Sequence, residues 1–176
     1  MGPPGGGRTV ITQRYTRHFN LLNFIPFDTD SLNRIFNTIL TSFLQSFSSS
    51  VKALGHDVTS ATIAVYNRVA ETLLPTPAKS HYTYNLRDVA KVFQGVMQGD
   101  VMKLTEPAEL IRLWIHECTR VFSDRLIDDP DRNKFMAIVK EVVGSSFKAH
   151  KWDTVFGDNP TLVYGNFIDA RILVEK

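Results

Sequence analysis

A glycine-rich stretch near the start of the chain, GPPGGGRT at residues 2–9, has the glycine spacing of a phosphate-binding P-loop. Arg8 and Thr9 stand where a P-loop has Lys and Ser or Thr, and a planar guanidinium does not replace the compact lysine charge. A P-loop also opens a helix whose backbone N–H groups face the phosphates. The residues after Thr9 instead begin with β-branched side chains and show no helical period before Asp28. We therefore expect a Gly/Pro turn here.

Arg87 is a stronger candidate for anion binding. It lies two residues after Asn85, a favourable N-cap, and so falls in the first turn of an expected helix. A cation there opposes the helix dipole, and this placement becomes favourable when an anion binds at the helix start. The alternative is an exposed arginine without a specific role, as many surface arginines are.

A second group of polar residues, His116, Glu117 and Arg120, resembles the zinc-binding pattern HExxH except at its last position. Arginine cannot bind zinc, so we expect a solvated helix face instead. The remaining histidines lie far apart in the sequence without ligand spacing, and no metal site is predicted. Cys118 falls in an apolar helical pattern, which favours a buried packing role over a nucleophile.

The composition is that of a globular chain with one sizeable core. The 176 residues are 43% hydrophobic, and 20 basic against 18 acidic side chains give a net charge of +2. Basic and aromatic residues do not interleave on one expected surface, so nucleic acid is not a predicted partner. No run of 18 apolar residues occurs, and we expect no membrane association. A single cysteine excludes an internal disulfide and fits a reducing compartment.

The apolar pattern predicts a mainly α fold, an antiparallel helical bundle preceded by one short strand. Residues 21–27, LLNFIPF, fit a strand that ends at the proline, and from Ser145 the pattern becomes irregular. Helices are expected from Asp28–Asp30 to Phe47, from Asp57 or Thr59 to Leu74, from Asn85 to Gly99, from Pro107 to Phe122 and from Asp128 or Asp129 to Gly144. The first has an apolar face formed by Leu32, Ile35, Phe36, Ile39, Leu40, Phe43 and Phe47.

Four segments in this order and spacing, GPPGGGR, RYTRHFN, YNLRDVAKVFQGV and FSDRLIDDPDR, resemble the third AAA+ module of dynein heavy chains. The similarity begins at the sensor I loop and continues through the helical lid. It implies a rim of the AAA+ α/β subdomain at 1–28, the lid at 29–144 and a linker towards the next module at 145–176. The spelling TVITQRY is more similar to axonemal than to cytoplasmic chains.

The resemblance also implies roles for particular residues. Arg17 occupies the region of the arginine finger, with Arg14 as the alternative, and Arg87 matches the sensor II arginine that contacts the γ-phosphate. Gly2 falls at the sensor I position, so polar sensing is absent there. The phosphate-binding loop and the acids that hold magnesium are expected upstream, so this chain alone is expected to be inactive as an ATPase.

The implied parent is an ATP-driven, minus-end-directed microtubule motor that uses ATP/ADP with Mg, whereas no cofactor is expected for this fragment alone. Its implied partners are the neighbouring AAA+ modules, microtubules, and intermediate and light chains. The implied location is the cytoplasm and cytoskeleton, or the ciliary axoneme for an axonemal chain. The alternative is a free-standing helical module that docks a partner protein through Phe36, Phe43 and Phe47, with the arginines incidental.

Overall fold

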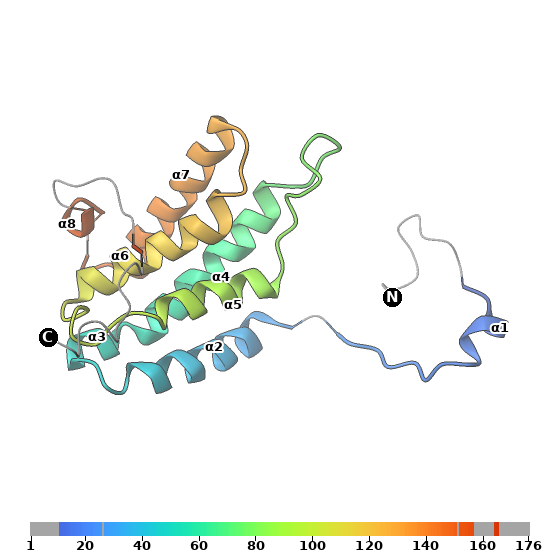
Figure 1. Cartoon of the computed structure of the whole chain (residues 1–176), viewed down its shortest axis with the longest axis horizontal. Coiled ribbons are helices and arrows are strands. Elements are labelled where there is room, and N and C mark those ends of the chain that lie inside the picture. The colour runs from blue at the N-terminus through green and yellow to red at the C-terminus, as the bar shows by residue number, and fades with distance from the viewer. Residues whose placement is uncertain (1–10, 26, 151, 157–163, 166–176) are drawn as a thin grey trace, which may run out of the picture.

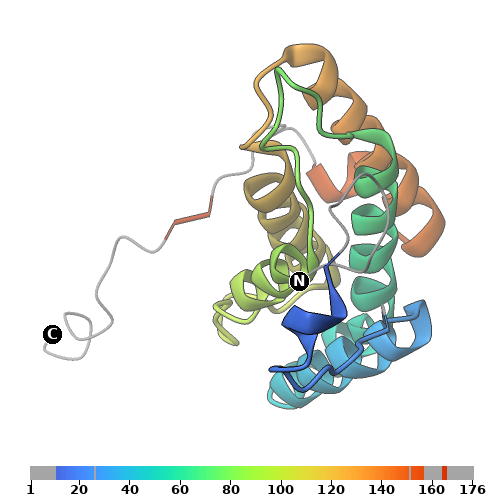
Figure 2. The same cartoon turned by 90° about the vertical axis from the view of Figure 1, so that its right-hand side faces the viewer.

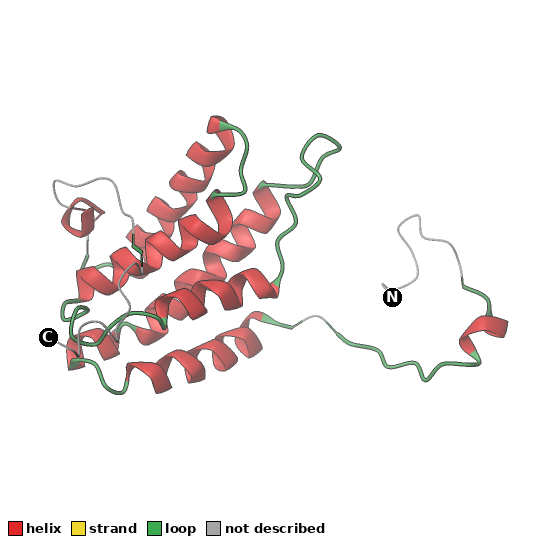
Figure 3. Cartoon of the chain, in the orientation of Figure 1, coloured by secondary structure: helices red, strands yellow, loops and turns green. Residues whose placement is uncertain are grey.

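The computed structural model describes residues 11–25, 27–150, 152–156 and 164–165. The glycine-rich stretch at 2–9, with the sensor I position at Gly2, lies outside these residues. The described part is mainly helical, as predicted, and forms a bundle with a separate short helix towards the N-terminus (Figures 1 and 3). The elements are α1 (Gln13–Thr16), α2 (Thr29–Leu44), α3 (Ser49–Ala53), α4 (Gly55–Thr72), α5 (Leu86–Val96), α6 (Pro107–Cys118), the π-helical turn η1 (Thr119–Ser123), α7 (Asp129–Ser146) and α8 (Trp152–Phe156).

The predicted strand at 21–27 is wrong for the described part of this segment. Residues 21–25 and 27 have no regular secondary structure, and Leu22, Phe24 and Ile25 are each at least 80% exposed. A strand exists only when a neighbouring strand accepts and donates its backbone hydrogen bonds. No described segment lies beside these residues as a partner, so the apolar pattern has nothing to pair with here.

Helix α2 begins as predicted, but its buried face is narrower than expected. The Asp28 side chain accepts a hydrogen bond from the Ser31 N–H at 3.0 Å and caps the helix. Ile35 and Ile39 are 43% and 44% exposed, because they lie at the edge of the apolar stripe, and Phe43 is only partly buried. The residues of α2 that pack inward recur at every fourth position: Leu32, Phe36, Leu40 and Leu44.

The first apolar face is therefore not available for docking a partner through its phenylalanines. Phe36 is buried and its ring stacks on Phe93 with centroids 4.6 Å apart. Phe47 is 4% exposed and contacts the half-buried ring of Phe43. This packing removes the basis of the interaction-module alternative.

The residues between the first two expected helices, 48–56, are themselves partly helical. Helix α3 forms within it and buries Val51, and α4 then starts at Gly55, ahead of the predicted Asp57 or Thr59. Gly55 lies close to α2, since a Cβ there would lie 3.3 Å from Leu44 Cδ1. The missing side chain allows the two helices to meet at this corner.

Two helix ends also differ from their predicted positions. Helix α5 ends at Val96, before Gly99, because the following residues tighten into i→i+3 turns that include the hydrogen bond from the Gly99 N–H to the Val96 carbonyl. Helix α7 continues through Gly144 to Ser146. Phe147 is buried against Trp114, with ring centroids 5.4 Å apart, and this contact keeps the last turn of α7 on the core.

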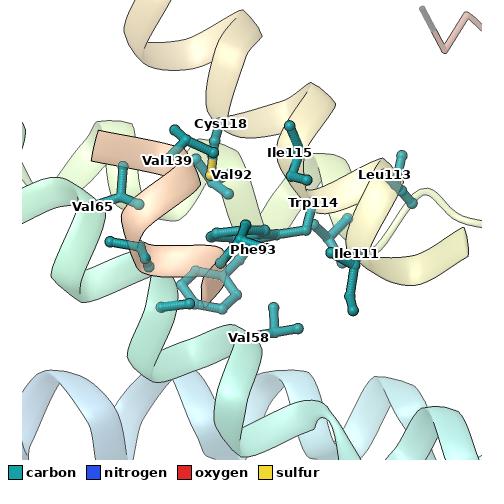
Figure 4. Close-up of a cluster of buried hydrophobic side chains, with 14 of the residues drawn as sticks. Val58, Val65, Val92, Phe93, Ile111, Leu113, Trp114, Ile115, Cys118 and Val139 are labelled. Atoms are coloured by element: carbon teal, nitrogen blue, oxygen red, sulfur yellow. The ribbon is translucent and has the colours of Figure 1, made fainter. Parts of the chain in front are cut away.

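Helix α4 is the central element of the bundle, with α2 packed on one side and α7 on another (Figure 2). Trp114 of α6 is fully buried in the same core, and its Nε1–H donates to Thr62 Oγ1 of α4 at 2.8 Å. Cys118 lies nearby in the cluster of Figure 4, buried as predicted, and burial raises the pKa of its thiol. The core thus joins α6 to α4, the central helix of the bundle.

The expected solvated face of α6 is wrong for Glu117, which is buried. Its side chain is buried between α6 and α5, where its Oε2 accepts hydrogen bonds from Arg120 Nη2 at 2.6 Å and Arg120 Nε at 2.8 Å. Gly95 of α5 makes room for this carboxylate, because a Cβ there would lie 1.8 Å from Glu117 Oε2.

The described part of the tail predicted to be irregular contains a short helix, α8. Helix α8 buries Val155 and Phe156. Arg112 of α6 donates from Nη2 to the Phe156 carbonyl at 2.8 Å, which holds the end of α8 against the bundle. None of the helices in the described ranges has the length and apolar character required to cross a membrane.

Two of the helical glycines, Gly95 and Gly144, should respond in opposite ways to alanine. Gly95→Ala should destabilise the fold by about 1–3 kcal/mol, because the new methyl group displaces the buried Glu117 carboxylate. Gly144→Ala should stabilise it by about 0.5–1 kcal/mol through helix propensity, since nothing lies within 4 Å of its added Cβ. Urea unfolding of both variants measures the difference, and equal shifts would contradict the close approach of α5 and α6.

The revised inner face of α2 gives a second prediction. Phe36→Ala should cost about 3–5 kcal/mol of unfolding free energy, because it empties a site between α2 and Phe93. Ile39→Ala should cost less than about 1 kcal/mol, because this side chain is 44% exposed. Chemical denaturation of the pair checks the face, and a larger loss for Ile39→Ala would show that the helix is rotated.

Candidate functional site

The start of helix α5 is built as the sequence predicted. The Asn85 Oδ1 accepts a hydrogen bond from the Arg87 N–H at 2.8 Å, and the Asp88 Oδ2 accepts one from the Asn85 N–H at 3.1 Å. The two side chains together form a capping box. The backbone N–H of Arg87 is therefore hydrogen-bonded directly to Asn85, the N-cap of the helix.

The Arg87 side chain is exposed in that first turn. Among the described residues, no carboxylate lies within 4.0 Å of its guanidinium, whereas Lys91, one turn later, lies 3.8 Å from Asp88. The charge of Arg87 also opposes the positive end of the helix dipole. The position thus presents a cation to solvent beside the N–H groups of a helix start, which is a suitable arrangement for an oxyanion ligand.

Asp88, the neighbour of Arg87, is a buried carboxylate that is 3% exposed. Arg125, which follows η1, reaches it with Nη2 donating to Oδ1 at 2.8 Å. Burial raises the pKa of Asp88, but the hydrogen bonds from Arg125 and from the Asn85 N–H outweigh it and hold this pKa below its usual value. Asp88 therefore stays ionised and acts as an acceptor for both partners.

Arg125 binds the loop before α5 as well as the helix itself. Its Nη1 donates to the Thr83 carbonyl at 2.9 Å, and its guanidinium lies over the ring of Tyr84, 5.0 Å from the centroid. The Tyr84 hydroxyl is buried without a hydrogen-bond partner in the described part of the chain, and burial raises the pKa of Tyr84 to about 12. Arg125 thus contacts three groups: the Thr83 carbonyl in the loop, the ring of Tyr84 and the Asp88 carboxylate of the capping box.

A second ionic contact ties the same loop to the start of α7. Lys79 pairs with Asp128 and with Asp131, and these hydrogen bonds raise the pKa of Lys79 above its ordinary value. The Tyr82 hydroxyl donates to Asp131 Oδ2 at 3.1 Å and accepts from the Ile127 N–H at 3.1 Å. This cluster does not touch Asn85 or Asp88, so it fixes the loop without contacting the capping box.

Sequence reasoning missed both Arg125 and Lys79. Their partners lie 37 and 52 residues away along the chain, and no local spacing connects such positions. The one available signal was the density of charges in FSDRLIDDPDR, which contains Arg125, Asp128 and Asp131.

The structure does not bring the two arginine-finger candidates close to Arg87. Arg14 lies in the last turn of α1, and Arg17 follows that helix, with its Nε donating to His18 Nε2 at 3.1 Å. Both are exposed, and α1 is set apart from the bundle (Figure 1). Within the described ranges, no group of three or more His, Cys, Asp or Glu side chains is arranged to hold a metal ion.

Comparison with known proteins shows the family to which this chain belongs. Residues 58–156, more than half of the chain, match the family model of the AAA+ lid domain. The chain is 45% identical over 183 residues to dynein axonemal heavy chain 2 of Mus musculus, covering 98% of this chain and 4% of the relative. It is 44% identical over 195 residues to dynein axonemal heavy chain 12 of Mus musculus, covering 99% of this chain and 6% of the relative.

A third relative, human dynein axonemal heavy chain 1, is 42% identical over 183 residues, covering 96% of this chain and 4% of the relative. The chain thus spans only a small part of the length of these relatives. The predicted similarity to dynein heavy chains is confirmed, and the relatives named here are axonemal. This chain belongs to the AAA+ lid domain family, and the proteins that it matches across nearly its whole length are axonemal dynein heavy chains.

Proposed function

We propose that this chain supplies the helical lid of an AAA+ module in an axonemal, minus-end-directed microtubule motor, and that Arg87 contacts the γ-phosphate of ATP bound to that module. The observation that supports this role is the Arg87 guanidinium in the first turn of a tightly capped helix, which has no carboxylate partner among the described residues. Other cations of the bundle, such as Lys79, Arg120 and Arg125, have carboxylate partners. Arg87 is thus available for an external anion.

The parts of the chain have different roles in this proposal. Residues 1–28 are the rim of an α/β subdomain, 29–144 the lid and 145–176 a linker towards the next module. The module is the third of the ring, which rests on the segments GPPGGGR and NLRDVAKVFQG. Arg17, or Arg14 in its place, is the arginine finger for the nucleotide of the preceding module.

The proposal places the chain in a larger assembly. The full-length protein binds ATP or ADP with Mg, its neighbouring AAA+ modules contact this lid, and its other partners are microtubules and intermediate and light chains. The expected location is the ciliary axoneme. The named relatives, all axonemal dynein heavy chains, support this assignment.

Arg87→Lys in the full-length protein tests the phosphate contact. Lysine keeps the charge but loses the planar fork, so a contact that strengthens in the transition state should weaken by about 2–4 kcal/mol while ATP affinity changes less. Single-turnover ATP hydrolysis at the third site, with the first site disabled by mutation, measures the rate, and a nucleotide titration measures the affinity.

Lys52→Arg is the matched control for this variant. It also exchanges one cation for another at an exposed helical position, in α3 rather than at the start of α5. It should leave both the hydrolysis rate and the affinity unchanged. A third site that turns over normally in the Arg87→Lys protein would remove the sensor assignment.

The isolated 176-residue chain should bind ATP weakly or not at all. Among its described residues, Arg87 is the one proposed ligand for the nucleotide of its own module, and a single exposed arginine gives little affinity in water. Isothermal titration of the chain with ATP and Mg checks this expectation. A micromolar dissociation constant would contradict it and would revive the P-loop interpretation of GPPGGGRT.

A further inference from the structure

We propose that Arg125 is the positioning residue for Arg87: by holding the Asp88 carboxylate in the capping box, it fixes the first turn of α5 and the direction from which Arg87 approaches its ligand. The importance of this for phosphate sensing rests on the function proposed above. The positioning itself rests on contacts within the chain.

The contacts form a continuous series from Arg125 to Arg87. Arg125 Nη2 donates to Asp88 Oδ1, the other Asp88 oxygen accepts from the Asn85 N–H, and Asn85 Oδ1 accepts from the Arg87 N–H. Each of these bonds is 3.1 Å or shorter. Removing the guanidinium would take away the charged group closest to this buried carboxylate and leave the exposed Lys91, 3.8 Å from Asp88 Oδ1, as its remaining charged partner among the described residues, which is unfavourable. Asp88 would then leave its buried position or bind a proton, and the capping box would weaken in either case.

The π-helical turn η1 gives Arg125 its position. A π turn holds one residue more than an α turn, so the residues that follow are rotated by about 100° relative to a continuing α-helix. Arg125 follows this turn, and its Nε donates back to the Val121 carbonyl within it at 3.2 Å. Its own carbonyl is hydrogen-bonded to His81 Nε2 at 3.0 Å. Hydrogen bonds of both the side chain and the backbone carbonyl of Arg125 therefore hold this residue in place, and its guanidinium is directed at Asp88.

Lys79 provides a matched control for a merely structural role. It joins the same loop to the same region of the bundle through Asp128 and Asp131, and its side chain is 24% exposed, the same as that of Arg125. It makes no contact with the capping box. Lys79→Met should therefore lower stability in the way Arg125→Met does, without disturbing Arg87.

The first measurement is hydrogen exchange of the backbone in the full-length protein, followed by mass spectrometry. Arg125→Met should speed exchange in the peptide that contains residues 85–90, because the capped first turn opens more often. Lys79→Met should speed exchange in the loop that precedes α5 and contains residue 79, and it should leave residues 85–90 protected. Arg125→Lys should fall between Arg125→Met and the parent, since it keeps the charge but loses the fork. Equal protection of residues 85–90 in Arg125→Met and the parent overturns the proposal.

The second measurement is single-turnover ATP hydrolysis at the third site in the same proteins. Arg125→Met should slow hydrolysis by about tenfold or more, because small misplacements of a catalytic group are costly, with a smaller change in affinity. In the Arg87→Lys background, Arg125→Met should add no further loss, because it acts through Arg87. Equal slowing by Lys79→Met and Arg125→Met would overturn the positioning role.

The two proposals fail in different ways. If Arg87→Lys leaves hydrolysis unchanged, the sensor function fails, and the exchange measurement still decides whether Arg125 holds the helix start. If Arg87→Lys slows hydrolysis but Arg125→Met changes neither exchange nor rate, the sensor function stands and the positioning role of Arg125 is wrong.

Discussion

The buried carboxylate of Asp88 is the group on which the candidate site depends. It joins a local motif, the capping box of α5, to a partner on another helix, because one of its oxygens accepts from Asn85 and the other from Arg125. A buried charge is tolerable only when such partners are in place. The start of α5, the loop before it and the end of the α6–η1 segment are therefore fixed together, and the orientation of Arg87 follows from all three.

The hydrophobic core and this ionic contact have complementary roles. The core packs α2 and α7 against α4 and buries Trp114 among them, which brings the helices together without specifying their ends. The charged clusters around Arg125 and Lys79 lie where loops meet helix starts and define those ends in detail. Apolar packing is non-directional, whereas a two-pronged guanidinium contact requires one geometry. A precise ligand contact needs the second kind of interaction.

The parts of this structure that local sequence determines were predictable. The caps at Asp28 and Asn85 are set by residues within one turn, and the helical bundle followed from apolar spacing. The width of a buried face is not local, so Ile35 and Ile39 were wrongly placed inside. Residues 21–25 have no strand partner within the part of the chain that the structure describes. The position of Arg87 in the first turn of α5 was predictable from the Asn85 cap, whereas Arg125 was missed because its contact with Asp88 joins distant positions. The burial of Glu117 depended on Gly95, a residue of another helix.

The exposed segment between α1 and α2 has a practical consequence for handling the chain. Phe19, Leu21, Leu22, Phe24, Ile25 and Phe27 are all more than half exposed and are close together in the sequence. An extended apolar segment with free backbone groups can pair with an identical segment on another molecule. We therefore expect this chain to aggregate more readily as its concentration rises. Recombinant protein that begins at the Asp28 cap should keep the bundle and lack the exposed apolar segment.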